Sequence, residues 1–269
     1  MMKLTLSLAQ MGVAIAQPDR NLEKGEGLVA EAARRGSDLV CFPEMWTTGF
    51  DWAQNERLAR ERQDVVGRIG EMARRHAIWI GGSVLALNPR GQVANTFVLF
   101  DNMGRQAGLY RKTHLFSLLH EDRYMAPGES LVTVPTPWGK AGLAVCYDVR
   151  FPEMFRTYAL QGCAFVLLPA AFPHPRLDHW KVLVPARAIE NQMYMVAVNR
   201  AGREDFGPDG EVTYFGHSLI VDPWGQTVVA AVGEGEELLT ATIDLDESAR
   251  VRSAMTVFQD RRPELYRLS

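Results

Sequence analysis

Cys146, Glu44 and Lys112 could together perform acyl transfer, and each ends or directly follows a short apolar run. A thiol with an ordinary pKa of about 8.5 is mostly protonated at neutral pH and needs a base. A carboxylate whose pKa is raised by burial can take that proton. A lysine ammonium can stabilise the oxyanion that forms when a thiolate attacks a carbonyl carbon. These side chains therefore have the types needed for a nucleophile, a base and an electrostatic stabiliser.

The stretch 142–153 places Cys146 between a predicted strand and a predicted helix. The run before it is apolar, short and entered from Gly142, which is typical of a buried strand. Pro152 suits the first turn of a helix, where its missing N–H would be unpaired anyway. A side chain at such a junction is held rigidly beside backbone N–H groups, as a nucleophile requires. On this stretch alone, an inert buried thiol at Cys146 stands as an equal alternative.

The elements around these residues follow from the pattern of apolar side chains. Strands are predicted at 4–9, 38–42, 78–87, 96–100, 108–112, 131–134, 140–145, 164–168, 194–198, 216–221, 227–231 and 238–243. Helices are predicted at 18–35, with Asp19 able to cap the N-terminus, and at 64–75, 153–161 and 180–191. The aromatic stretch 45–52 is interpreted as a loop, either a pocket wall or, preferably, ordinary packing. Strand–helix–strand order in both halves predicts two similar sheet layers, and short turns between some strands predict mixed sheets.

The composition limits the class of protein. The chain has 269 residues with 29 basic and 32 acidic side chains and no basic stripe, which disfavours nucleic acid as a partner. Cys41, Cys146 and Cys163 form no CxxC pair and no disulfide framework, which suits a reducing compartment. We find neither a signal peptide nor an apolar run able to span a bilayer. These observations predict a cytoplasmic protein without a membrane partner, with one domain over 1–269.

Three blocks of the sequence resemble the signature blocks of the nitrilase superfamily of carbon–nitrogen hydrolases. They are 42–44, 110–116 and 146–153, and their order and flanking residues both match. Further similar positions are Asn95-Thr96, His179-Trp180, 186–192, 216–218 and 222–225. The resemblance covers nearly the whole chain, so it implies the family's fold, an α/β four-layer αββα sandwich with two mixed β-sheets.

The resemblance also assigns roles to the reactive residues. It implies Glu44 as the base, Lys112 as an oxyanion donor and Cys146 as the nucleophile that forms a thioester. A second glutamate is implied in the loop after the lysine block. Glu121 is the candidate, with Asp122 beside it as the alternative. No metal and no organic cofactor is required by this chemistry.

Other residues are expected to shape the site. The resemblance implies that Tyr147 adds its backbone N–H to the oxyanion site, and that Phe50 and Phe172 line the substrate pocket. Asp148 and Arg150 are interpreted as an ion pair that holds the turn after the nucleophile, with substrate binding as the alternative. A Cys–His dyad hydrolase, using His114, His179 or His217, or a non-catalytic interaction protein would be a function of a different class.

The resemblance is strongest to ω-amidase-like members of the superfamily. It implies hydrolysis of a small carboxylate-bearing amide with release of ammonia, and the runner-up is an N-carbamoyl amidohydrolase. The segment 170–175 departs from the pattern expected for close ω-amidases, which puts the substrate in doubt but not the chemistry. The family's mode of assembly implies a homodimer or a larger even oligomer, with 246–269 as a C-terminal docking arm.

Overall fold

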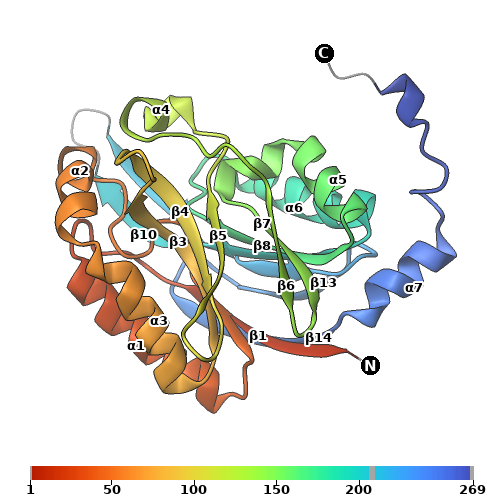
Figure 1. The fold of residues 1–269 in the computed structure, drawn as a ribbon, viewed down its shortest axis with the longest axis horizontal. Helices are drawn as coiled ribbons and strands as arrows, with labels where there is room; N and C mark the ends of the chain where they lie inside the picture. Colours follow the sequence, from red (N-terminus) through yellow and green to blue (C-terminus); the bar gives the residue numbers. More distant parts are fainter. Residues whose placement is uncertain (1, 206–209, 267–269) are drawn as a thin grey trace.

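The computed structural model describes residues 2–205 and 210–266 (Figure 1). Two six-stranded sheets form its centre, together with a small two-stranded hairpin. Sheet A has the order β14-β1-β2-β3-β4-β5, and sheet B has the order β13-β12-β9-β8-β7-β6. Both are mixed, because each has a parallel centre, β1-β2-β3 or β7-β8-β9, flanked by antiparallel strands.

The strands follow the predicted runs closely. Those of sheet A are β1 (Lys3–Gln10), β2 (Leu39–Cys41), β3 (Trp79–Leu87), β4 (Val93–Phe100), β5 (Gln106–Arg111) and β14 (Glu237–Asp244). Those of sheet B are β6 (Val132–Thr136), β7 (Gly139–Leu143), β8 (Cys163–Ala170), β9 (Tyr194–Asn199), β12 (Leu219–Val221) and β13 (Thr227–Ala230). The hairpin consists of β10 (Ala201–Asp205) and β11 (Glu211–Phe215), and the sequence reasoning did not predict it.

Helices cover the outer faces of the two sheets. The longer ones are α1 (Pro18–Arg34), α2 (Trp52–Glu61), α3 (Asp64–His76), α5 (Pro152–Leu160), α6 (Leu177–Asn191) and α7 (Asp246–Ala254). Short turns of helix are α4 (Glu121–Tyr124) and the 3-10 segments Ser117–Leu119, Cys146–Arg150 and Pro263–Leu265. In Figure 1, α1 and α3 lie on the side of sheet A, and α5 and α6 lie on the side of sheet B. The predicted αββα sandwich is therefore confirmed.

The main core lies between the sheets, where the inward side chains of both meet. Leu6 on β1 and Leu99 on β4 share one apolar cluster with Phe165 on β8 and Val196 on β9, and all four are fully buried. A second cluster packs the outer face of sheet A against α1 and α3, including Val29 and Ile69. β8 and β9, whose two faces are both covered, are apolar almost throughout, whereas β1 alternates. No helix among the described residues is long and apolar enough to cross a membrane.

One local prediction was wrong and one helix was not predicted. Asp19 does not cap α1, since its carboxylate instead pairs with Arg62 and Arg68. The predicted loop at 45–52 ends at Trp52, where α2 begins, and the Asp51 side chain caps α2 by accepting a hydrogen bond from the Gln54 backbone N–H at 3.1 Å. An aspartate ahead of a helix start is an ordinary N-cap signal, which the surrounding aromatic residues obscured.

Candidate active site

The ends of three strands bring the candidate residues together. Glu44 follows β2, Lys112 directly follows β5 and Cys146 follows β7. In sheet A, β2 and β5 point the same way, because β2 is parallel to β3 and two antiparallel pairings separate β3 from β5. Their C-terminal ends therefore lie at one edge of that sheet, and the end of β7 in sheet B faces this edge.

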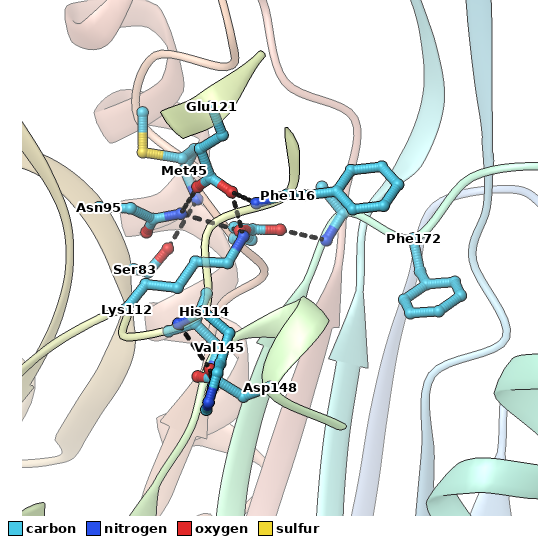
Figure 2. A network of polar contacts seen from close by, with 12 residues as sticks. Met45, Ser83, Asn95, Lys112, His114, Phe116, Glu121, Val145, Asp148 and Phe172 are labelled. Carbon is cyan, nitrogen blue, oxygen red and sulfur yellow. Dashed lines mark hydrogen bonds and ion pairs between the residues drawn. The ribbon is translucent and has the colours of Figure 1, made fainter. Parts of the chain in front are cut away.

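The Lys112 ammonium lies between two carboxylates (Figure 2). Its Nζ is 2.8 Å from Glu44 Oε1 and 2.7 Å from Glu121 Oε2. All three side chains are at most 2% exposed. Buried charges of this kind are stable only when they are paired and hydrogen-bonded, so removing one member would leave the others uncompensated.

Glu121, not Asp122, is the second carboxylate of the cluster. Glu121 is buried and also accepts a hydrogen bond from the Phe116 backbone N–H at 2.8 Å, whereas Asp122 is exposed. Asn95 completes the network, because its Nδ2 donates to Glu44 Oε1 at 2.8 Å and to Glu121 Oε1 at 3.2 Å. No role was assigned to Asn95 from the sequence. The signal that could have found it is its place on β4 directly opposite the strand leading to Lys112, whose N–H binds the Asn95 carbonyl at 2.9 Å.

Glu44 also reaches across to sheet B. The Ala171 backbone N–H donates to Glu44 Oε2 at 2.9 Å, and the Glu44 N–H donates to the Ala170 carbonyl at 3.3 Å. Both partners lie at the end of β8, the neighbour of β7. One oxygen of the carboxylate is thus held by Lys112 and the other by the sheet that carries Cys146.

Cys146 has a strained backbone and a buried thiol. Its φ is +47°, in the left-handed region that residues other than glycine seldom adopt. Strain of this kind is concentrated at functional sites. Burial raises the pKa of the thiol well above its usual value, and the negative charge of Glu44 raises it further against the opposing charge of Lys112. The resting thiol is therefore protonated at neutral pH, and attack requires a base.

The pKa values of Lys112 and Glu121 reflect the same competition between burial and neighbouring charges. Burial disfavours the ammonium of Lys112, but the charges of Glu121 and Glu44 outweigh it and raise the pKa well above the usual value. Burial raises the pKa of Glu121. The positive charge of Lys112 lowers this pKa and the negative charge of Glu44 raises it, and the net shift is upward. Lys112 therefore stays charged throughout the neutral range.

Asp148 fixes the turn after Cys146, but not through Arg150 as predicted. Its Oδ2 accepts from the Val145 N–H at 2.7 Å and from the Tyr110 hydroxyl at 2.8 Å. Its Oδ1 lies 2.7 Å from the ring Nδ1 of His114. The predicted ion pair was wrong, since Arg150 instead donates to His179 Nδ1 at 3.1 Å. Asp148 consequently ties the segment carrying Lys112 to the turn carrying Cys146.

A small pocket opens above the thiol. Its empty space of about 280 Å³ includes open solvent, and its lining is Phe116, Leu119, Cys146, Tyr147, Arg150, Ala171, Phe172, Pro173 and Arg176. Tyr147 and Phe172 are among these lining residues, and their contact with substrate stays a prediction. Arg150 takes the place that its alternative interpretation, substrate binding, requires. Arg176 was not predicted, because only the fold brings the segment between β8 and α6 over Cys146.

Phe50 does not line this pocket. It is buried beside Leu58 and Tyr214, and its backbone N–H donates to Glu204 Oε1 at 2.7 Å. Its predicted role in substrate binding gains no support from the pocket lining and stays a prediction.

A carbon-nitrogen hydrolase family model matches residues 5–253, which is most of the chain. This chain belongs to the carbon–nitrogen hydrolase family. The 2-oxoglutaramate amidase of Bacillus subtilis (strain 168) is 38% identical over 98% of this chain and 100% of its own length. The mouse protein named omega-amidase NIT2 is 34% identical over 97% of this chain and 96% of its own length.

A solved structure of an amidase agrees with the fold. The amidase from Nesterenkonia sp. AN1 has a TM-score of 0.86 and 28% identity, covering 98% of this chain and 95% of that one. That structure shows the acetamide moiety of fluoroacetamide covalently added at the active-site cysteine of that amidase. The predicted amidase of the carbon–nitrogen hydrolase family is confirmed by these comparisons.

The alternative of a Cys–His dyad finds no support in the geometry of this family member. His114 is bound to Asp148 and stacks on Phe151 with ring centroids 3.6 Å apart. Within residues 2–205 and 210–266, no hydrogen bond joins Cys146 to a histidine. The other two thiols, Cys41 and Cys163, are buried in strands, and burial raises the pKa of Cys163 to about 12.

Proposed function

We propose that this carbon–nitrogen hydrolase cleaves a small amide that carries a carboxylate at its far end, with Cys146 as the nucleophile. The observation that carries the proposal is the position of Arg150 in the pocket above the thiol. Its guanidinium contacts His179 and the rings of Tyr147 and Phe172, and no carboxylate pairs with it among the described residues. A cation left open beside a nucleophile suits a substrate that brings its own negative charge.

Acylation begins with the protonated thiol. Glu44 takes the proton as the Cys146 sulfur bonds to the amide carbon, and the carbonyl electron pair moves onto oxygen. Lys112 and the backbone N–H of Tyr147 stabilise this oxyanion. When the oxyanion collapses, the C–N bond breaks, the Glu44 proton passes to nitrogen, and ammonia leaves behind a thioester.

In deacylation Glu44 again acts as the base, and its proton now comes from water. Glu44 takes a proton from water as the water oxygen bonds to the thioester carbon, and the second oxyanion is stabilised as before. Collapse breaks the C–S bond, the thiolate recovers the proton from Glu44, and the acid leaves. Glu121 supports both steps by holding Lys112 from the side opposite Glu44, and Asn95 fixes the two carboxylates.

The proposed substrate is an ω-amide of a small dicarboxylate. The names of the two relatives, 2-oxoglutaramate amidase and omega-amidase, describe amides of this kind, and they support the choice made from Arg150. The pocket is narrow and mostly apolar apart from its arginines, which suits a short aliphatic chain between the amide and the carboxylate.

Ammonia release over a panel of compounds tests the proposal. The panel contains ω-amides, uncharged aliphatic amides, N-carbamoyl amino acids and nitriles, each with the unsubstituted protein, Cys146→Ala and the control Cys163→Ala. We expect release from ω-amides that Cys146→Ala abolishes and Cys163→Ala retains, with an acyl adduct on Cys146 by mass spectrometry. A preference for uncharged amides would contradict the proposal that the substrate carries a carboxylate. Carbon dioxide formed together with ammonia would identify an N-carbamoyl amidohydrolase instead.

The assembly and location of the chain form part of the same proposal. We expect one domain that works in the cytoplasm as a homodimer or a larger even oligomer. The docking arm predicted at 246–269 begins with α7, after which residues 255–266 extend away from the two sheets (Figure 1), and 267–269 lie outside the described residues. Leu265 and Tyr266 near its end are 65% and 54% exposed, which supports an arm that packs on a second copy.

A further inference from the structure

Asn95 is a fully buried amide on β4 whose nitrogen serves two different carboxylates. Its Nδ2 donates to Glu44 Oε1 at 2.8 Å and to Glu121 Oε1 at 3.2 Å. The side chain lies beside Lys112 and Glu121 (Figure 2). Its Oδ1 accepts no hydrogen bond among the described residues. The opposite orientation of the amide would set Oδ1 against two carboxylates, so the network itself fixes the donor end toward the acids.

The two oxygens of Glu44 are occupied unequally. An ionised carboxylate oxygen has about two acceptor positions. Oε1 fills both, because it accepts from Asn95 Nδ2 at 2.8 Å and from Lys112 Nζ at 2.8 Å. Oε2 accepts the Ala171 backbone N–H at 2.9 Å and keeps its second position for a proton. A proton that arrives at Glu44 therefore finds its acceptor on Oε2.

Oε2 is also the oxygen on the side of the thiol. Ala171 lines the pocket together with Cys146, and its N–H is bound to Oε2. After burial, which raises the pKa of the Cys146 thiol most, the charge and the hydrogen bond of Glu44 raise it further, and a hydrogen bond from the Ala171 N–H lowers it. One backbone N–H thus lies within reach of both the sulfur and Oε2, which places Oε2 beside the sulfur.

We propose that Asn95 is a positioning residue that, by occupying Oε1 of Glu44, reserves Oε2 for the thiol proton of Cys146. This inference rests on the proposed function, since it concerns the proton step of the same reaction. Lys112 alone would leave one position of Oε1 open, and the proton would then have a second place to bind, farther from the sulfur. Asn95 is not among the residues that line the pocket, so it acts through Glu44 rather than on the substrate.

The proton step balances with Oε2 as the acceptor. The S–H bond of Cys146 breaks and its proton bonds to Oε2, while the sulfur electron pair bonds to the amide carbon and the carbonyl pair moves onto oxygen. The same proton then passes from Oε2 to the leaving nitrogen as the C–N bond breaks. Oε1 becomes the carbonyl oxygen of the neutral acid and still accepts from Lys112 and Asn95, so these donors need no rearrangement during the reaction.

The experiment follows ammonia release with the unsubstituted protein, Asn95→Leu, Asn95→Asp and the control Asn191→Leu. Asn191 is a fully buried amide on α6, outside the pocket lining, whose Nδ2 donates to the Arg187 carbonyl at 3.0 Å and to Glu190 Oε1 at 3.3 Å. Its substitution therefore removes a matched buried amide away from the thiol. The substrates are glutaramate and the uncharged propionamide, because the proton step does not depend on the far end of the substrate.

We expect Asn95→Leu to lower kcat by about 10- to 100-fold on whichever substrate is turned over, with KM within about threefold, as loss of a hydrogen bond to a charged group does. Asn191→Leu should lower the melting temperature similarly and keep kcat within about threefold. Asn95→Asp should be as slow as Asn95→Leu near about pH 8 and recover part of the loss toward about pH 6, because its new carboxyl gains a donor when it is protonated. Asn95→Leu has no group to protonate and should stay slow at both pH values.

Each other outcome contradicts a stated part of the inference. A kcat of Asn95→Leu within about threefold of the unsubstituted protein, or an equal loss in Asn191→Leu, would overturn the positioning role. A loss in Asn95→Asp that does not recover at lower pH would show that donation by Asn95 is not what the reaction requires. Turnover of propionamide alone would contradict the carboxylate of the proposed substrate but leave the Asn95 comparison intact. Absence of Cys146-dependent release from both amides would overturn the proposed function and the inference that rests on it.

Discussion

Asp148 Oδ1 lies 2.7 Å from His114 Nδ1, and the other oxygen of Asp148 binds the Val145 N–H directly before Cys146 (Figure 2). One fully buried carboxylate therefore links the histidine next to the lysine block with the turn that carries the thiol. This relationship makes His114 a support of the turn rather than a base for Cys146. Asp148 also fixes the position of the segment that carries Lys112 relative to the turn that carries Cys146.

The first prediction separates support from catalysis at this link. Asp148→Asn replaces acceptors with an amide whose N–H groups must face other donors, so it should lower the free energy of unfolding by about 1–3 kcal/mol and also reduce kcat. His114→Ala removes one partner of Asp148 and should keep activity within about 10-fold of the unsubstituted protein. Urea unfolding and steady-state kinetics measure both effects. If His114→Ala were as inactive as Cys146→Ala, the dyad interpretation would return.

The second prediction compares two adjacent acids. Glu121→Gln leaves the Lys112 ammonium with one carboxylate and should lower kcat by about 10²-fold, in the range seen when electrostatic support of an oxyanion is lost. Asp122→Asn alters an exposed side chain and should change kcat by less than about threefold. Both proteins should be checked for folding by circular dichroism before their kinetics are compared. Equal effects of the two substitutions on kcat would contradict a role for Glu121 in the site.

The distinction between these acids shows where sequence reasoning stops. The strand ends that carry Glu44, Lys112 and Cys146 were predictable, because short apolar runs followed by polar residues mark them directly. Glu121 and Asp122 could not be told apart, since both stand at the start of a four-residue helix whose rotation decides which side chain is buried. The places of Arg176 and Asn95 in the site depend on which loops and strands the fold brings to one edge of the sheets. No local sequence pattern indicates this arrangement.

The third prediction concerns the pH dependence of Cys146. After burial, the charge of Glu44 and its hydrogen bond to the thiol raise the pKa of Cys146, whereas Lys112 lowers it. Glu44→Gln should therefore lower the thiol pKa, and Lys112→Met should raise it. Alkylation by iodoacetamide should begin at lower pH in Glu44→Gln and at higher pH in Lys112→Met than in the unsubstituted protein.

Amide hydrolysis should respond differently from alkylation in the same proteins. Glu44→Gln gives a more reactive thiol toward iodoacetamide but should lose turnover, because its amide cannot carry the proton to the leaving nitrogen. Lys112→Met should lose both reactivities near neutral pH. Turnover that increased in parallel with alkylation in Glu44→Gln would show that thiolate formation alone limits the reaction, and Glu44 would not be the base.

The fourth prediction concerns the C-terminal docking arm. Phe258 anchors its base, with the guanidinium carbons of Arg156 and Arg252 at 5.1 and 5.3 Å from the ring centre, while Leu265 and Tyr266 stay exposed. Ending the chain after Ala254 should therefore leave the fold intact and halve the mass measured by light scattering. The double substitution Leu265→Ser and Tyr266→Ser keeps the anchor and should weaken association in the same direction. A monomeric mass for the unsubstituted protein at working concentration would refute the dimer, and an unchanged dimeric mass after truncation would move the interface to another face.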